Sequence, residues 1–82
     1  MVDVGGKNMH TYEVGVYNKF IRDKVREGER VKVHEAKWEE VHYFDIESEN
    51  EIGAVKIIRE KYSKLLGFEI ECITKYTTSS YD

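Results

Sequence analysis

Three stretches of the chain alternate between apolar and polar residues, which is the pattern of half-buried β-strands. They cover residues 11–17, 38–47 and 68–73. In each strand we expect the apolar residues to face the core and the polar ones to face outward. The expected core faces are Tyr12/Val14/Val16, His42/Phe44/Ile46 and Phe68/Ile70/Cys72.

A short helix is predicted directly after the first strand. Asn18 is a good N-cap for a helix over 19–27, and Gly28 is suited to end it. The charged stretch 28–37 is predicted to be a loop, although Val31 and Val33 would also suit a short strand.

A second, longer helix follows the second strand. Ser48 and Glu51 have the Ser-x-x-Glu spacing of a capping box. Apolar residues then recur every three or four positions, which predicts a helix of about five turns with one apolar stripe. Gly67 is placed to take the left-handed position after it. The stripe consists of Ile52, Val55, Ile58, Tyr62, Leu65 and Leu66.

These elements predict an α+β fold, a two-layer sandwich of a three-stranded sheet with two helices on one face, in β-α-β-α-β order. The other sheet face is expected to meet solvent. Residues 11–76 form one domain in this scheme, 1–10 a flexible lead-in and 77–82 a flexible tail. The order of the strands within the sheet is left open.

Composition narrows the function classes. The chain has 82 residues, a net charge of −3 and 35% charged residues, which argues against a general nucleic-acid coat or a polybasic membrane anchor. No apolar run approaches the roughly 18 residues of a membrane span. The single cysteine, Cys72, fits a reducing compartment. We therefore expect a cytoplasmic protein that does not engage membranes.

Charge is also segregated along the chain. Residues 19–34 hold six lysines and arginines against three acidic residues, whereas 35–55 hold one against seven. The basic segment 19–32 is a candidate site for an acidic protein or a nucleic-acid backbone; as an alternative, its charges are simply solvated and paired locally. Its basic residues are Lys19, Arg22, Lys24, Arg26, Arg30 and Lys32.

The outer face of the sheet is the second candidate surface. It is expected to carry more apolar area than a solvated face needs, together with two unpaired sheet edges. We expect a protein partner or a second copy of this chain to cover it, and a homodimer by edge pairing or sheet-face packing. The apolar residues in question are Tyr17, Val41, Tyr43 and Ile73.

Catalytic and metal-binding patterns are absent from the sequence. The three histidines, His10, His34 and His42, show no metal-ligand spacing, and no Cys-x-x-Cys pair occurs. Cys72 is expected to be buried and unreactive. Gly5 and Gly6 are not followed by the lysine and serine of a phosphate-binding loop. We therefore expect neither an enzyme nor a cofactor.

Residues 17–25 read Tyr-Asn-Lys-Phe-Ile-Arg-Asp-Lys-Val. This segment resembles the Tyr-Asn-Lys-Leu-Val-Arg-Asp-Lys-Ile opening of MazG-like nucleotide pyrophosphohydrolases. The resemblance implies an all-helical enzyme that chelates magnesium with paired Glu-x-x-Glu and Glu-x-x-Asp helices. Because this chain lacks those paired motifs, we interpret the nine-residue match as coincidental.

A broader resemblance covers most of 12–73. It is carried by residues 12–29, by Glu49-Asn50-Glu51 and by residues 67–70, which look like small uncharacterised proteins of tailed marine cyanophages. The resemblance implies expression in the cytoplasm of an infected cell and carries no known activity. The leading hypothesis is a small, non-enzymatic protein-interaction module. A nucleic-acid-binding protein using 19–32 is the alternative, and a degenerate pyrophosphohydrolase is the third.

Overall fold

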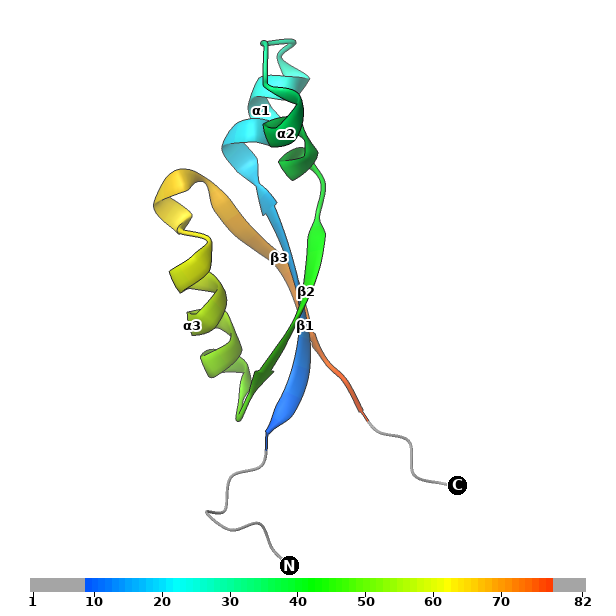
Figure 1. The fold of residues 1–82 in the computed structure, drawn as a ribbon, viewed down its shortest axis with the longest axis vertical. Helices are drawn as coiled ribbons and strands as arrows, with labels where there is room; N and C mark the ends of the chain where they lie inside the picture. The colour runs from blue at the N-terminus through cyan, green and yellow to red at the C-terminus, as the bar shows by residue number, and fades with distance from the viewer. Residues whose placement is uncertain (1–8, 78–82) are drawn as a thin grey trace, which may run out of the picture.

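The computed structural model describes residues 9–77, which form a small α+β fold around a three-stranded antiparallel sheet (Figure 1). Most of the expected lead-in and tail, residues 1–8 and 78–82, lies outside the described residues. The strands are β1 (His10–Asn18), β2 (His42–Ser48) and β3 (Phe68–Lys75). The helices are α1 (Lys19–Arg26), α2 (Val33–Ala36) and α3 (Glu51–Lys61), with 3-10 turns at Lys37–Glu39 and Lys64–Leu66.

The strand order, which the sequence left open, is β2-β1-β3. β1 is the central strand and pairs antiparallel with both neighbours. Its central position agrees with its burial, because Val14 and Val16 are both 0% exposed. The expected core face of this strand is confirmed: Tyr12, Val14 and Val16 are all buried.

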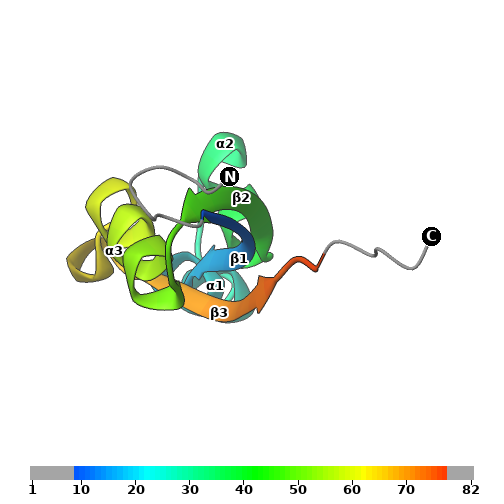
Figure 2. The same cartoon turned by 90° about the horizontal axis from the view of Figure 1, so that it is seen from below.

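One helix, α3, covers this face of the sheet (Figure 2). Its buried residues, Ala54 and Ile58, complete the core with the three β1 side chains. By contrast, α1 and α2 lie together beyond the end of the sheet (Figure 1). The reason is local: Asn18 is both the last residue of β1 and the N-cap of α1, so no linker turns α1 back over the sheet. Of the two helices expected on this face, α3 packs there and α1 does not.

A β-bulge in β3 corrects the expected faces of that strand. Gly15 pairs with Cys72, but the next residue, Val16, pairs with Ile70, so Glu71 is the extra residue. An extra residue reverses the side of the sheet on which the following residues lie. Ile73, expected on the outer face, therefore packs against the core, whereas Cys72, expected in the core, lies on the outer face beside Gly15.

The long helix is shorter than its apolar stripe predicted. α3 ends at Lys61, and Tyr62 has an extended backbone (φ −126°, ψ 92°). Ser63 then caps a separate 3-10 turn by accepting a hydrogen bond from the Leu65 N–H at 3.1 Å. This break turns Leu65 away from the core, so it is 89% exposed. Leu66, in the same turn, is also exposed, and so is Ile52 at the N-terminal end of the predicted stripe.

The N-terminus of α3 corrects the capping-box prediction. Ser48 is the last residue of β2, not the cap. The cap is Asn50, whose Oδ1 accepts a hydrogen bond from the Gly53 N–H at 2.7 Å. Ser48 instead donates from Oγ to the Asn50 carbonyl at 2.9 Å and is buried. Ser48 and Asn50 are both residue types that cap helices, and Asn50, whose side chain reaches the first turn, caps α3.

Trp38 lies in a 3-10 turn, so the strand expected at 38–47 begins four residues later, at His42. In the preceding segment Val33 opens the short helix α2 rather than a strand. The Trp38 ring contacts the His42 ring at a centroid distance of 4.4 Å. It also contacts Tyr62 at 5.3 Å and Phe68 at 5.2 Å. These aromatic contacts extend the core toward α1.

Candidate functional site

The face of the sheet opposite α3 carries a small apolar centre over Gly15. A Cβ atom placed at Gly15 would lie 2.8 Å from Val41 Cγ1, 2.9 Å from Cys72 Sγ and 3.0 Å from Tyr43 Cε1. The three side chains, which come from β3, from β2 and from the residue before β2, thus converge above the one residue that has no side chain. Tyr43 remains 58% exposed. We call this surface the open sheet face.

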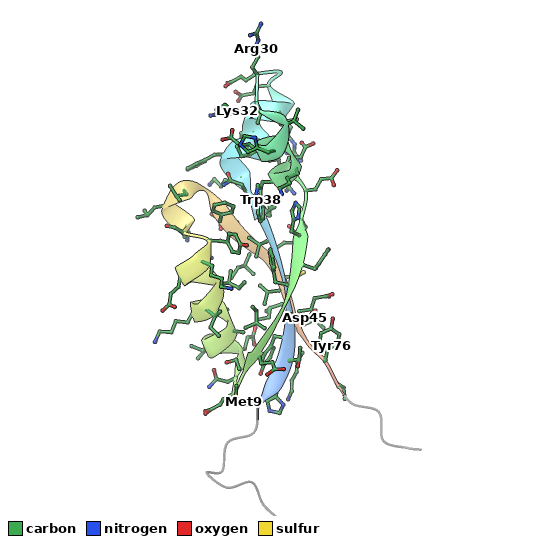
Figure 3. The ribbon with its side chains drawn as sticks, in the orientation of Figure 1. Met9, Arg30, Lys32, Trp38, Asp45 and Tyr76 are labelled. Carbon is green, nitrogen blue, oxygen red and sulfur yellow. The ribbon has the colours of Figure 1, made fainter. Side chains whose placement is uncertain are left out.

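Carboxylates lie beside this apolar centre. The Tyr76 hydroxyl donates to Asp45 Oδ1 at 3.1 Å and lies 3.4 Å from Glu13 Oε2. Figure 3 shows Asp45 and Tyr76 on the same side of the ribbon. The hydrogen bond to Asp45 raises the pKa of Tyr76, and the negative charges of Asp45 and Glu13 raise it further. The open sheet face therefore joins an apolar centre to an acidic border.

Tyr17 also faces outward, but its ring is partly covered. The Arg22 guanidinium carbon lies 3.8 Å from the centroid of the Tyr17 ring, which is a cation–π contact. Arg22 also donates from Nε to the Glu39 carbonyl at 2.9 Å. Tyr17 and Arg22, both predicted as interaction residues, thus bind each other and hold α1 against the turn that precedes β2.

The remaining basic residues lie on α1 and at the tip of the molecule beyond it. Lys24 and Arg26 are exposed on α1, and Figure 3 shows Arg30 at the far tip of the molecule, pointing away from it. Acidic residues lie among them: a hydrogen bond and repulsion from Glu29 raise the pKa of Glu27. The basic segment 19–32 therefore carries acidic side chains among its lysines and arginines.

Of the predicted apolar residues, the structure brings together Val41 and Tyr43. Ile73 lies on the core side, as described above. Sequence reasoning missed Cys72 because its place on the outer face depends on the bulge in β3. It expected Gly15 on the outer face of β1 but did not assign it to a site. It also missed Tyr76, which was assigned to the domain but not to a site. A glycine inside an alternating strand was the available signal, since it often marks a close approach of neighbouring groups.

The described residues contain neither a metal-ligand cluster nor a membrane-spanning helix. Among residues 9–77, no three His, Cys, Asp or Glu side chains lie where they could hold a metal ion together. No helix in this part of the chain is long and apolar enough to cross a membrane. The sheet also differs from the all-helical fold that the match at residues 17–25 would imply.

Comparison with known proteins adds no relative: no protein-family model, no curated protein and no solved structure matches the chain.

Proposed function

We propose that this chain is a small, non-enzymatic protein-interaction module that binds another protein through the open sheet face. The observation that carries the proposal is the convergence of Val41, Tyr43 and Cys72 over Gly15 on a face that α3 does not cover. An exposed tyrosine in an apolar setting is a common centre of binding energy in protein interfaces, because its large ring buries much area and its hydroxyl keeps a polar contact.

The acidic border defines the kind of partner. Glu13 and Asp45 lie on the same face as Tyr43, and the Tyr76 hydroxyl contacts both carboxylates. Complementary charge at the edge of an interface steers association and excludes partners of like charge. The preferred partner is therefore a protein surface with an apolar centre and lysine or arginine around it. The same carboxylates repel phosphate groups, so the face favours protein over nucleic acid.

Site-specific photo-crosslinking in cells that carry the gene tests this proposal. A benzophenone amino acid at position 43 should give a discrete crosslinked product whose second component mass spectrometry identifies. The same group in place of Val33, which is 89% exposed on α2, is the matched control and should give no such product. Crosslinks of equal yield from both positions, or none from position 43, would contradict the proposal.

A charge variant gives an independent check. Asp45→Lys reverses one border charge and should reduce the yield of the crosslinked product, whereas Lys24→Glu on α1 should leave it unchanged. If Lys24→Glu raises the yield by as much as Asp45→Lys lowers it, net charge, rather than the open sheet face, governs the contact.

A further inference from the structure

A second apolar surface lies at the end of the sheet where α1 begins, beside the 3-10 turn before β3. Phe20, Leu65 and Gly67 line a shallow groove of about 320 Å³, with Lys19, Lys64 and Glu69 around it. We propose that this surface, the Phe20–Leu65 groove, binds an acidic amphipathic segment of a partner protein.

The exposure of the groove residues requires an explanation. At the groove, Leu65 is 89% exposed and Phe20 48%. Leu66, the next residue of the same turn, does not line the groove and is 65% exposed. Three large apolar side chains in one place are more than a solvated surface needs, and such patches mark binding sites. A leucine on an ordinary exposed turn is easily replaced by a polar residue at no cost to folding, so two in succession are most simply explained by a partner that covers them.

The groove is held rigidly before any partner binds. The Lys19 N–H donates to the Gly67 carbonyl at 2.8 Å, and Asn18 Nδ2 donates to the Leu66 carbonyl at 3.0 Å. Gly67 has a φ of +100°, and a Cβ there would collide with Asn18 and Phe20. Glycine is therefore required at the floor of the groove. A preformed site loses less conformational entropy on binding, which favours affinity.

Charge identifies the occupant. Lys19 and Lys64 are both exposed at the groove, whereas its one acidic residue, Glu69, is half-buried. An apolar floor with lysines at the rim is complementary to a segment whose apolar side chains recur on one face and whose other residues are acidic. The open sheet face has the opposite sign at its border, so the two surfaces select different partner segments.

The described ends of the chain do not lie at the groove. His10, where β1 begins, and Lys75, where β3 ends, are at the opposite end of the sheet (Figure 1). The proposed occupant is a separate molecule, an acidic segment whose charge is complementary to Lys19 and Lys64 at the rim.

Selection from a yeast-displayed library of random peptides of about a dozen residues, with the whole chain as bait, tests the proposal. Enriched peptides should combine two or more large apolar residues with a net negative charge. A labelled enriched peptide should bind Leu65→Asp at least about tenfold more weakly, and Lys64→Glu should weaken it as well. Ile52→Asp and Lys56→Glu, which change an exposed apolar and a basic residue on α3, are the matched controls and should alter affinity less than about twofold.

Circular dichroism of each variant confirms that the fold is retained, as expected for substitutions at exposed positions. Three outcomes would overturn the proposal: no enriched peptide, enriched peptides without acidic residues, or equal binding to Leu65→Asp. A fourth outcome that would overturn it comes from sedimentation equilibrium of the parent chain and of Leu65→Asp. If this substitution converts a dimer to a monomer, the groove holds a second copy of the chain instead.

Discussion

The side chain of Asn18 donates from Nδ2 to the main-chain carbonyl of Leu66 at 3.0 Å, across 48 positions of sequence. The same side chain caps α1, because its Oδ1 accepts from the Ile21 N–H at 3.1 Å. Asn18 is 5% exposed, so both bonds are largely shielded from water. One buried amide thus joins the end of β1, the start of α1 and the turn before β3.

Replacing Asn18 separates these two roles. Asn18→Asp keeps an acceptor for the helix cap but places a carboxylate against the Leu66 carbonyl, and we expect a loss of about 1–3 kcal/mol in the free energy of unfolding. Asn18→Ala also removes the cap, which adds about 1 kcal/mol. Urea titration measures both losses. If Asn18→Asp is as stable as the parent chain, the bond to Leu66 contributes nothing.

Ile58 is the largest fully buried side chain of α3, at 1% exposed. Ile58→Ala should lower the free energy of unfolding by about 2–5 kcal/mol, because the cavity it leaves is enclosed by β1 and α3. Ile52→Ala on the same helix is the control. Since Ile52 is 78% exposed, it should change stability by less than about 0.5 kcal/mol. Similar losses in urea titrations of the two variants would show that the buried face of α3 is misassigned.

The contrast between these two isoleucines shows what the apolar pattern can predict. Spacing alone placed Ile52 and Ile58 on one stripe, but the helix buries Ala54 and Ile58, which are four residues apart. The stripe was also extended to Leu65 because spacing does not register the break at Tyr62. The side chain of Ser63 can cap a new turn, and such local competition with a continuing helix is visible only weakly in sequence.

The strands show the same limit. The faces of β1 were predicted correctly because its alternation is uninterrupted and it pairs on both sides. Those of β3 were reversed after Glu71 because a bulge is a property of two paired strands, and alternation within one strand does not reveal it. As a result, Val41 and Tyr43 of the open sheet face were predicted, whereas Cys72 was not.

The close approach of Ser48 to Gly53 predicts that Gly53→Ala changes stability in opposite directions with and without the Ser48 hydroxyl. A Cβ at Gly53 would collide with Ser48 Oγ, while the Ser48 Cβ atom lies at an ordinary 3.6 Å. Gly53→Ala should therefore destabilise the parent chain. In the Ser48→Ala background the collision is gone, and Gly53→Ala should stabilise by about 0.5–1 kcal/mol through its better helix propensity. A double-mutant cycle from urea titrations checks this, and additive effects would contradict the contact.

The Tyr76 hydroxyl reports on the acidic border of the open sheet face. Its pKa is raised by the hydrogen bond to Asp45 and by the charges of Asp45 and Glu13. Because the folded-state pKa lies above the unfolded value, this contact stabilises the fold below the ordinary tyrosine pKa, and its contribution is lost as pH rises through the raised pKa.

Asp45→Asn should therefore move the pKa of Tyr76 back toward its ordinary value. NMR titration of the Tyr76 ring resonances measures the shift. Glu47→Gln removes a second carboxylate from the same face of β2 and is the matched control, for which we expect no comparable change. If Asp45→Asn leaves the pKa of Tyr76 where it is, the hydroxyl does not donate to Asp45 in solution.

The two edges of the sheet differ in how readily they can pair with another chain. Within the described residues, β2 and β3 each pair on one side only, with β1. β3 carries the bulge at Glu71, and both bulges and charged residues discourage edge pairing. β2 pairs with β1 from His42 to Ser48 without a register shift. Its outer edge is therefore the better route to self-association.

We expect a homodimer in which two β2 strands pair antiparallel about Phe44. This register sets Tyr43 opposite Asp45 of the second copy, whereas a register centred on Asp45 would set two carboxylates face to face, which is unfavourable. Sedimentation equilibrium at micromolar concentration should give twice the mass of one chain. Tyr43→Asp places like charges opposite each other and should give a monomer, while Tyr43→Lys places an opposite charge beside Asp45 and should keep the dimer. A monomer for the parent chain at every concentration would rule out the dimer, and a monomer for both variants would rule out this register.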